Sequence, residues 1–203
     1  MEQISKVITV EEHFMSEKVN GEYQKLLEKK NLTLAQKAKA NFIQQFVAKG
    51  EITEVGEKRL EFMETHGIDC QILSYGNNSP SYLDPKQAVV LCQLANEELA
   101  GYCKQYPGNF YGFAVLPVGD TGAALTELER AVKTLGLKGI IFNGAYQESY
   151  FDEDRFFPIF EMAQELKVPV MLHPGEVPTE VAKTYYQDRK STRQNSSHHT
   201  ESG

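Results

Sequence analysis

Apolar and polar residues follow two different periods along the chain. Short, nearly continuous apolar runs are typical of buried parallel strands. They alternate with longer segments in which apolar residues recur every three or four positions, as on one face of a helix. The apolar runs predict five strands, at residues 6–14, 70–75, 109–118, 137–143 and 168–173.

Capping residues mark several of the helices between the predicted strands. Asp84–Pro85 supplies an N-cap and a first-turn proline, and the helix that it opens is expected to reach about Gln105. Asp120 begins another helix, which Gly136 ends. Further helices are predicted at about 53–66 and 154–166, and the charged segment 15–52 is predicted to be a largely helical insertion.

The alternation of strand and helix predicts an α/β fold built from βαβ units. Five parallel strands allow two architectures. One is an open, doubly wound sheet. The other is a (β/α)8 TIM barrel present only as its first five βα units, since a whole barrel takes about 250 residues. The pattern alone leaves both open.

Composition narrows the class of protein. The chain has 203 residues, 41% of them hydrophobic, which excludes a disordered polymer. Its net charge of -7 disfavours nucleic acid and anionic membranes as partners. No apolar run approaches the ~18 residues of a membrane span, and no secretory signal is visible. Cys70, Cys92 and Cys103 are odd in number and lack a C-x-x-C spacing, so we expect reduced thiols, buried as fillers, in a cytoplasmic protein.

The ends of the first and fifth strands carry the candidate chemistry. On a regular strand, one face carries Val7, Thr9, Glu11 and His13, and it becomes polar toward its C-terminal end. His173 stands at the same end of the fifth strand. In α/β proteins this end holds the active site. Two imidazoles and a carboxylate can bind a divalent metal and leave positions open for water or substrate.

Each of these residues also has a simpler explanation. Glu11 and His13 can form a strand end that faces solvent, because an E-x-H spacing is short enough to arise by chance. His173 can be a lone core or loop histidine. The convergence of both candidates on the same strand ends favours a binding site. His66, beside Gly67, is interpreted as an exposed residue at a helix end.

Other motifs are absent or weak. No glycine-rich phosphate loop follows the first strand, and no serine lies in a G-x-S-x-G turn, which disfavours nucleotide-binding and serine-hydrolase functions. Ser74, Asn143 and Tyr146 lie at or just past strand ends and are candidates for lining a substrate pocket. Ordinary loop hydrogen bonds explain these three residues equally well.

The last sixteen residues differ from the rest of the chain. Residues 188–203 contain no Val, Ile, Leu, Met or aromatic residue, so they cannot form a core element. The stretch Asp188 to His198 resembles the translation of a common sequencing-adapter oligonucleotide and departs from it only at Gln194. We therefore expect a partial barrel over 1–187 and a non-native, disordered tail over 188–203.

Six segments, taken in order, resemble one family. The chain is similar to the metal-dependent amidohydrolase superfamily, in the branch of aminocarboxymuconate-semialdehyde decarboxylase and the dihydroxybenzoate (γ-resorcylate) decarboxylases. The similarity covers essentially residues 5–178. The segments are VEEHF (10–14), RLEFMETHGIDCQILS (59–74), ANEELA (95–100), PGNFYGFAVLPV (107–118), GIIFNG (139–144) and PVMLHPG (169–175).

The resemblance implies a (β/α)8 barrel with a metal, Zn2+ or Mn2+, at its C-terminal mouth. By position, Glu11 and His13 are ligands from the first strand and His173 is the ligand from the fifth. The family also uses a His after strand six and an Asp after strand eight. Both are expected beyond this chain, so the catalytic acid and base stay unassigned. The insertion 15–52 is then a lid or a dimer contact, and the parent protein a homodimer or homotetramer.

Three functions follow as alternatives. The E-x-H form favours a non-oxidative decarboxylase of a small aromatic or unsaturated carboxylic acid. The second alternative is a metal-dependent hydrolase of the same barrel family. The third is a non-catalytic five-stranded α/β binding module. With the acid and base groups absent, we expect the 203-residue chain itself to be inactive even if its parent is an enzyme.

Overall fold

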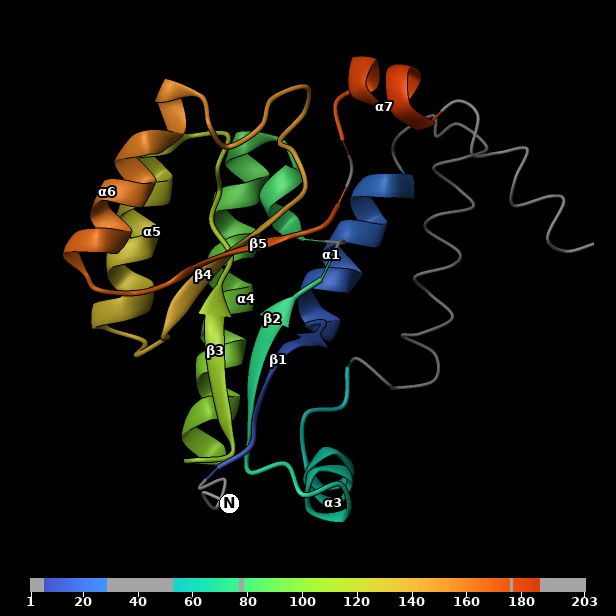
Figure 1. Ribbon diagram of the computed structural model, residues 1–203, viewed down its shortest axis with the longest axis vertical. Helices are drawn as coiled ribbons and strands as arrows, with labels where there is room; N and C mark the ends of the chain where they lie inside the picture. Colours follow the sequence, from blue (N-terminus) through green and yellow to red (C-terminus); the bar gives the residue numbers. More distant parts are fainter. Residues whose placement is uncertain (1–5, 29–52, 77–78, 176, 187–203) are drawn as a thin grey trace, which may run out of the picture.

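The five strands form one parallel sheet in sequential order. The computed structural model describes residues 6–28, 53–76, 79–175 and 177–186 (Figure 1). An open doubly wound sheet reverses its strand order at a switch point, whereas a barrel does not. The observed order β1-β2-β3-β4-β5 therefore agrees with the first five strands of a (β/α)8 barrel and excludes the doubly wound sheet. The strands are β1 Ile8–Phe14, β2 Cys70–Tyr75, β3 Phe110–Ala114, β4 Gly139–Asn143 and β5 Val170–His173.

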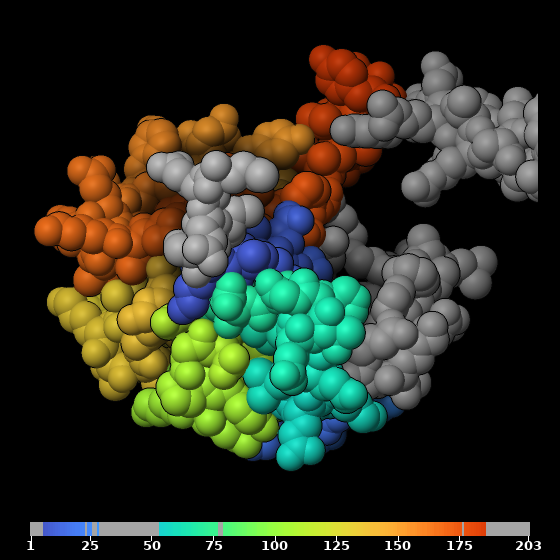
Figure 2. Space-filling view, turned by 60° about the horizontal axis from the view of Figure 1, so that its bottom comes forward, coloured from blue at the N-terminus to red at the C-terminus, as the bar shows by residue number. Residues whose placement is uncertain are grey.

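Helices cover one side of this sheet and both of its ends. Figure 1 shows α4, α5 and α6 grouped beside the sheet, with α3 and α7 at opposite ends of the molecule. In Figure 2 the cyan segment that carries α3 lies against the green residues around the end of α4. The helices are α1 Glu17–Glu28, α3 Glu57–Thr65, α4 Pro85–Gln105, α5 Thr121–Lys133, α6 Phe157–Glu165 and α7 Thr179–Tyr186, with 3-10 turns η1 Pro80–Tyr82 and η2 Asp154–Phe156.

The predicted elements agree with the structure except at a few boundaries. The second strand and the helix after Asp84 have the predicted bounds. The third strand ends at Ala114, four residues before the predicted end, because the Asn96 side chain, in place of a neighbouring strand, forms hydrogen bonds with the backbone N–H and C=O of Val115. The Asn96 amide donates to Val115 O (2.9 Å), and Val115 N donates to Asn96 Oδ1 (3.0 Å). The sequence did not predict α7.

Part of the sequence-based interpretation falls outside the described residues. Of the insertion predicted at 15–52, the structure describes α1 and the residues beside it, while 29–52 lie outside. The predicted tail, 188–203, also lies outside. Among the described helices, none is both long and apolar enough to cross a membrane.

The core lies between the sheet and its covering helices, and β3 approaches α4 closely at Gly112. A Cβ atom on Gly112 would stand 2.6 Å from Cδ2 of Leu99 and 2.9 Å from Cδ2 of Leu137. Both leucines are fully buried, so neither can move into solvent. The position therefore admits only glycine without repacking.

We expect Gly112→Ala to lower the free energy of unfolding by about 1–3 kcal/mol, since overpacking a close contact forces side chains off their preferred rotamers. Urea unfolding of the chain measures the change. Gly101→Ala is the matched control, because Gly101 lies in α4 with no atom near its Cβ position. That substitution should stabilise the helix by up to ~1 kcal/mol. Equal stability of the two variants would contradict the tight contact.

Candidate metal centre

A β-bulge precedes the end of β1. Thr9 pairs with Gln71 and Glu12 pairs with Leu73, so β1 holds one more residue than β2 across this interval. Glu11 has a φ of 63°, in the left-handed region that non-glycine residues rarely adopt. A bulge of this kind bends a strand and turns the following side chains to the other side of the sheet.

The bulge decides where His13 points. Ile8 and His13 are five residues apart, yet they pair with Cys70 and Ser74, which are four apart and share a face of β2. Because paired residues of parallel strands project to the same side, His13 faces the side that Ile8 faces. The prediction that Thr9 shares this face is wrong, because it assumed an uninterrupted two-residue period.

The two predicted histidine ligands meet across the sheet. His13 Nε2 lies 3.2 Å from His173 Nε2, and the ring centroids are 4.8 Å apart at an interplanar angle of 71°. Between them in the chain lie 159 residues, so only the curvature of the sheet brings the rings together. Two ring nitrogens at this distance can share one proton or bind one cation.

Glu11 lies beside the pair without closing on it. Its Oε1 is 3.9 Å from His173 Nε2, and the Glu11 side chain is 52% exposed. Within the described ranges, no group of three or more His, Cys, Asp or Glu side chains is close enough together to hold a metal ion. The two histidines are thus in contact at 3.2 Å, while the Glu11 carboxylate lies farther out, 3.9 Å from His173.

The surroundings keep His13 in the form that binds metals. Burial lowers the pKa of His13, and the neighbouring His173 lowers it further, while the Ser74 backbone and the carboxylates of Glu11 and Glu12 partly oppose this. A neutral imidazole is the metal-binding form. Two imidazoles and a carboxylate fit Zn2+ or Mn2+ in donor chemistry.

The second ring nitrogens lack the support that such ligands usually have. Nδ1 of His13 and Nδ1 of His173 are buried and make no hydrogen bond of standard geometry with the described residues. In metal sites that nitrogen commonly donates to a carboxylate or carbonyl, which fixes the ring. The His13 ring is in contact with the His173 ring, and the backbone that sets its direction is that of the bulged strand β1.

Ser74 and Asn143 flank the histidines in register. Ser74 pairs with His13 across β1 and β2, and Asn143 pairs with His173 across β4 and β5. Both side chains are buried, and Ser74 Oγ and Asn143 Oδ1 have no hydrogen-bond partner among the described residues. The Asn143 amide donates to Tyr75 O at 3.3 Å. Each residue therefore holds a spare polar atom next to a histidine.

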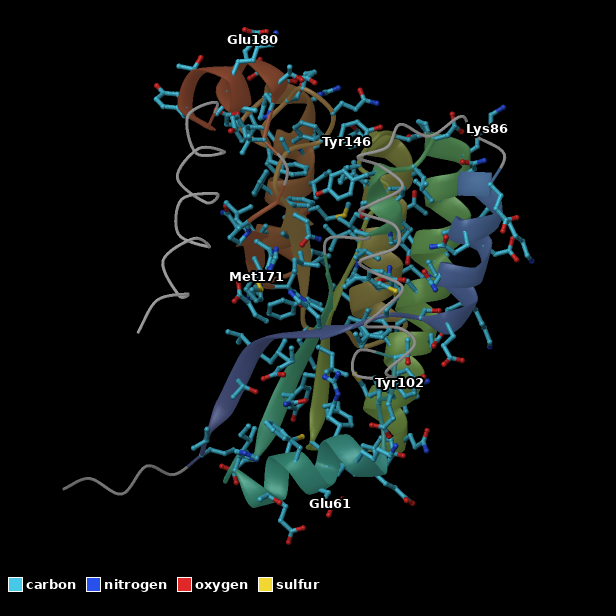
Figure 3. All side chains as sticks on the ribbon, turned by 90° about the vertical axis from the view of Figure 1, so that its right-hand side faces the viewer. Glu61, Lys86, Tyr102, Tyr146, Met171 and Glu180 are labelled. Carbon is cyan, nitrogen blue, oxygen red and sulfur yellow. The ribbon has the colours of Figure 1, made fainter. Side chains whose placement is uncertain are left out.

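Tyr146 lies at the same end of the molecule but packs into an aromatic group. Figure 3 shows it near the end that carries Glu180, far from Glu61 on α3. Its ring stacks on Tyr82 (6.1 Å between centroids) and meets Phe156 edge-on, and its hydroxyl accepts a hydrogen bond from Gln147 Nε2. Tyr146 is 3% exposed.

Two residues near the centre were missed by the sequence analysis. The Tyr82 hydroxyl donates to Asn143 O and accepts from Asn143 N–H, so it fixes the end of β4. Arg59 Nη2 donates to His13 O at 3.0 Å. No local pattern marks either residue, because each acts on a strand far away in the sequence.

The remaining sequence interpretations concern histidine and cysteine. His66 is the exposed C-cap of α3, and its Nδ1 lies 2.8 Å from Phe62 O, which confirms a helix-end role. Cys70 and Cys92 are buried and Cys103 is partly so. Burial raises the pKa of the Cys103 thiol to about 11, so the protonated form dominates at neutral pH.

Comparison with known proteins decides the family. The amidohydrolase family model matches residues 48–201, which is most of the chain. The chain belongs to the amidohydrolase family. A γ-resorcylate decarboxylase from Rhizobium radiobacter is 36% identical over 132 residues, or 61% of this chain and 40% of the relative. A 2-amino-3-carboxymuconate-6-semialdehyde decarboxylase from Dictyostelium discoideum is 31% identical over 120 residues, 59% of this chain and 33% of the relative.

A solved amidohydrolase structure supports the half-barrel. The 5-carboxyvanillate decarboxylase of Novosphingobium aromaticivorans, with bound manganese and 3-methoxy-4-hydroxy-5-nitrobenzoic acid, superposes with a TM-score of 0.78 at 28% identity. The match covers 89% of this chain and 54% of that structure. The chain therefore spans about half the length of the solved neighbour, and the matched part spans 40% of the γ-resorcylate decarboxylase.

Proposed function

We propose that this amidohydrolase chain is part of a metal-dependent, non-oxidative decarboxylase of a small aromatic carboxylic acid. The observation that carries the proposal is the contact of 3.2 Å between the Nε2 atoms of His13 and His173. His13 is the next-to-last residue of β1 and His173 is the last residue of β5, so both lie at the carboxyl ends of the strands, where barrels keep their chemistry. The relatives named above, which decarboxylate aromatic or unsaturated acids by name, support the substrate class.

In this proposal Glu11, His13 and His173 hold the metal. Manganese is favoured because the solved neighbour contains it, and zinc is the alternative that the same ligands allow. A divalent ion held there would supply Lewis acidity toward the carboxylate of the substrate. The lowered pKa of His13 keeps its imidazole in the neutral form at neutral pH, which is the form that binds a metal.

The neighbouring side chains orient the substrate. The Ser74 hydroxyl can donate to a substrate carboxylate, and Asn143 Oδ1 can accept from a phenolic hydroxyl, since both atoms are buried without a partner in the described part of the chain. Tyr146 supports this wall through Tyr82, which it stacks on and which bonds the Asn143 backbone. Leaving these buried atoms without a hydrogen bond costs free energy that a bound substrate recovers.

Decarboxylation also needs a proton at the ring carbon that loses CO2, and none of the described side chains is assigned here as its donor. General acid catalysis requires a group within hydrogen-bond reach of that carbon. The resemblance assigns it to a His after strand six or an Asp after strand eight. We therefore propose that the 203-residue chain has no turnover and that the longer parent does.

The test begins with the source transcript, sequenced past codon 187. The complete frame is expressed, freed of metal and reloaded with Mn2+ or Zn2+. Release of CO2 and of the phenol is then measured for 2,6-dihydroxybenzoate and 5-carboxyvanillate. One CO2 for each acid consumed, dependent on metal, is the expected result. Hydrolysis of an ester or lactone without CO2 would instead establish the metal hydrolase, and turnover by the 203-residue chain would refute its inactivity.

The remaining parts of the proposal concern partners and compartment. The partner is a small carboxylate substrate, with neither nucleic acid nor membrane, because a net charge of -7 repels polyanions. The parent is proposed to be a homodimer or homotetramer. The free cysteines suit a reducing compartment such as the cytoplasm.

A further inference from the structure

Arg59 reaches from α3 to the end of β1. Its Nη2 donates to His13 O (3.0 Å), its Nη1 to Gln71 Oε1 (3.4 Å) and its Nε to Glu54 O (3.3 Å). A single guanidinium thus joins the segment before α3, strand β2 and strand β1. Its planar fork of donors suits three acceptors in fixed directions.

Two of these acceptors belong to the paired positions that flank the β1 bulge. Gln71 pairs with Thr9, the last regular residue before the bulge, and His13 follows it. A bulge leaves backbone groups of the strand without their ladder partners. Arg59 supplies a donor to the His13 carbonyl and anchors the same guanidinium on the buried Gln71 side chain.

Charge also holds the guanidinium in this place. The carboxylates of Glu12 and Glu54 attract it, while burial opposes its charge. Glu12 is the first residue of β1 that pairs with β2 again after the bulge. Arg59 therefore interacts with β1 in two ways, through the charge of Glu12 and through a hydrogen bond to the His13 carbonyl.

We propose that Arg59 is a positioning residue, which stabilises the β1 bulge and so keeps His13 turned toward His173. Because the side-chain period of a strand is two, loss of the bulge would shift the register by one residue and turn His13 to the opposite face. The proposal deepens the proposed function, on which its prediction for metal affinity rests.

The first measurement is Mn2+ affinity of the 203-residue chain by isothermal titration calorimetry. Arg59→Met should weaken binding about 10–100-fold, the range known for residues that orient a metal ligand. Lys58→Met is the matched control, since Lys58 is the exposed neighbour on α3 and loses the same charge. It should leave the dissociation constant within about twofold, as surface charges far from the site are screened.

A second control separates positioning from general destabilisation. Met162→Ala removes a partly buried side chain from α6, away from β1. If Met162→Ala lowers the unfolding midpoint as much as Arg59→Met but keeps the Mn2+ affinity of the wild type, the positioning role is supported. If it weakens Mn2+ binding equally, Arg59 acts only through stability and the proposal is overturned.

The third measurement needs no metal. In imidazole NMR spectra of the metal-free chain, Arg59→Met should move the ring signals of His13 and leave those of His66 unchanged. Unmoved His13 signals would overturn the proposal. If the wild-type chain binds no Mn2+ while Arg59→Met moves the His13 signals, the positioning role stands and the proposed metal function of this chain fails.

Discussion

Replacing His173 with alanine is expected to weaken Mn2+ binding by more than about 100-fold, beyond the ~10–100-fold that supporting residues control. His173 supplies one of two Nε2 atoms that lie 3.2 Å apart, and its side chain is 11% exposed, so water cannot easily replace the lost ligand in the same direction. His13→Ala should have the same effect, because either substitution leaves a single imidazole.

The matched control is His66→Ala. His66 is exposed at the end of α3 and takes no part in the centre. Titration calorimetry of the three variants, each checked for folding by circular dichroism, makes the comparison. If His173→Ala binds Mn2+ as tightly as His66→Ala in a folded chain, His173 is not a ligand and the proposed centre is wrong.

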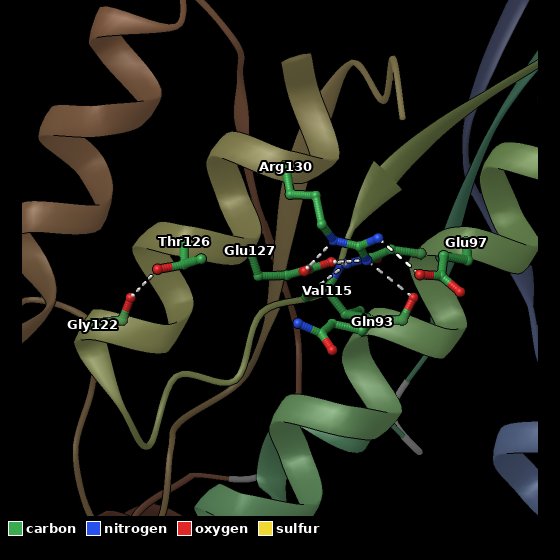
Figure 4. A network of polar contacts seen from close by, with 8 residues as sticks. Gln93, Glu97, Val115, Gly122, Thr126, Glu127 and Arg130 are labelled. Carbon is green, nitrogen blue, oxygen red and sulfur yellow. Dashed lines mark hydrogen bonds and ion pairs between the residues drawn. The ribbon is translucent and has the colours of Figure 1, made fainter. Parts of the chain in front are cut away.

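Glu127→Ala is expected to lower the free energy of unfolding by about 3 kcal/mol. Glu127 lies in α5 and is 1% exposed. Its Oε1 accepts hydrogen bonds from Asn96 Nδ2 (2.7 Å) and Arg130 Nη2 (2.8 Å), and its Oε2 accepts from Arg130 Nε (2.8 Å) (Figure 4). The carboxylate thus links α5 to Asn96 of α4, whose side chain bonds the backbone of Val115 directly after β3.

The expected size follows from what the substitution leaves behind. Removing one partner of a buried ion pair costs about 3–5 kcal/mol, because the remaining polar groups stay buried without a partner. The lower end applies, since the Arg130 side chain is 26% exposed and keeps its ion pair with Glu97 (2.8 Å). The Asn96 amide, which is fully buried, keeps only its bond to Val115.

Glu129→Ala provides the comparison for this prediction. Glu129 lies on the same helix, is exposed and pairs with Lys133 at 2.6 Å. An exposed pair of this kind contributes about 0.3–0.5 kcal/mol. Chemical unfolding of both variants should therefore differ by at least ~2 kcal/mol. Similar stabilities would mean that the buried network contributes no more than a surface ion pair.

The sequence by itself determined the local elements and the candidate ligands. Short apolar runs indicated the strands because a strand buried on both faces needs apolar side chains at consecutive positions. Asp84 and Asp120 marked helix starts because their carboxylates accept from backbone N–H groups, as both do here. Glu11, His13 and His173 became candidates because strand ends are where this class of fold places polar side chains.

Only the tertiary structure decided how these elements fit together. The sequential strand order, which selects the barrel over the doubly wound sheet, depends on which strands pair, and no single strand contains that information. The bulge at Glu11 interrupts the two-residue period, and Arg59, which lies in a different element, donates a hydrogen bond to the His13 carbonyl just after it. Periodicity reports only neighbours along the chain, whereas the direction of His13 depends on how β1 pairs with β2, where His13 lies beside Ser74, 61 positions away.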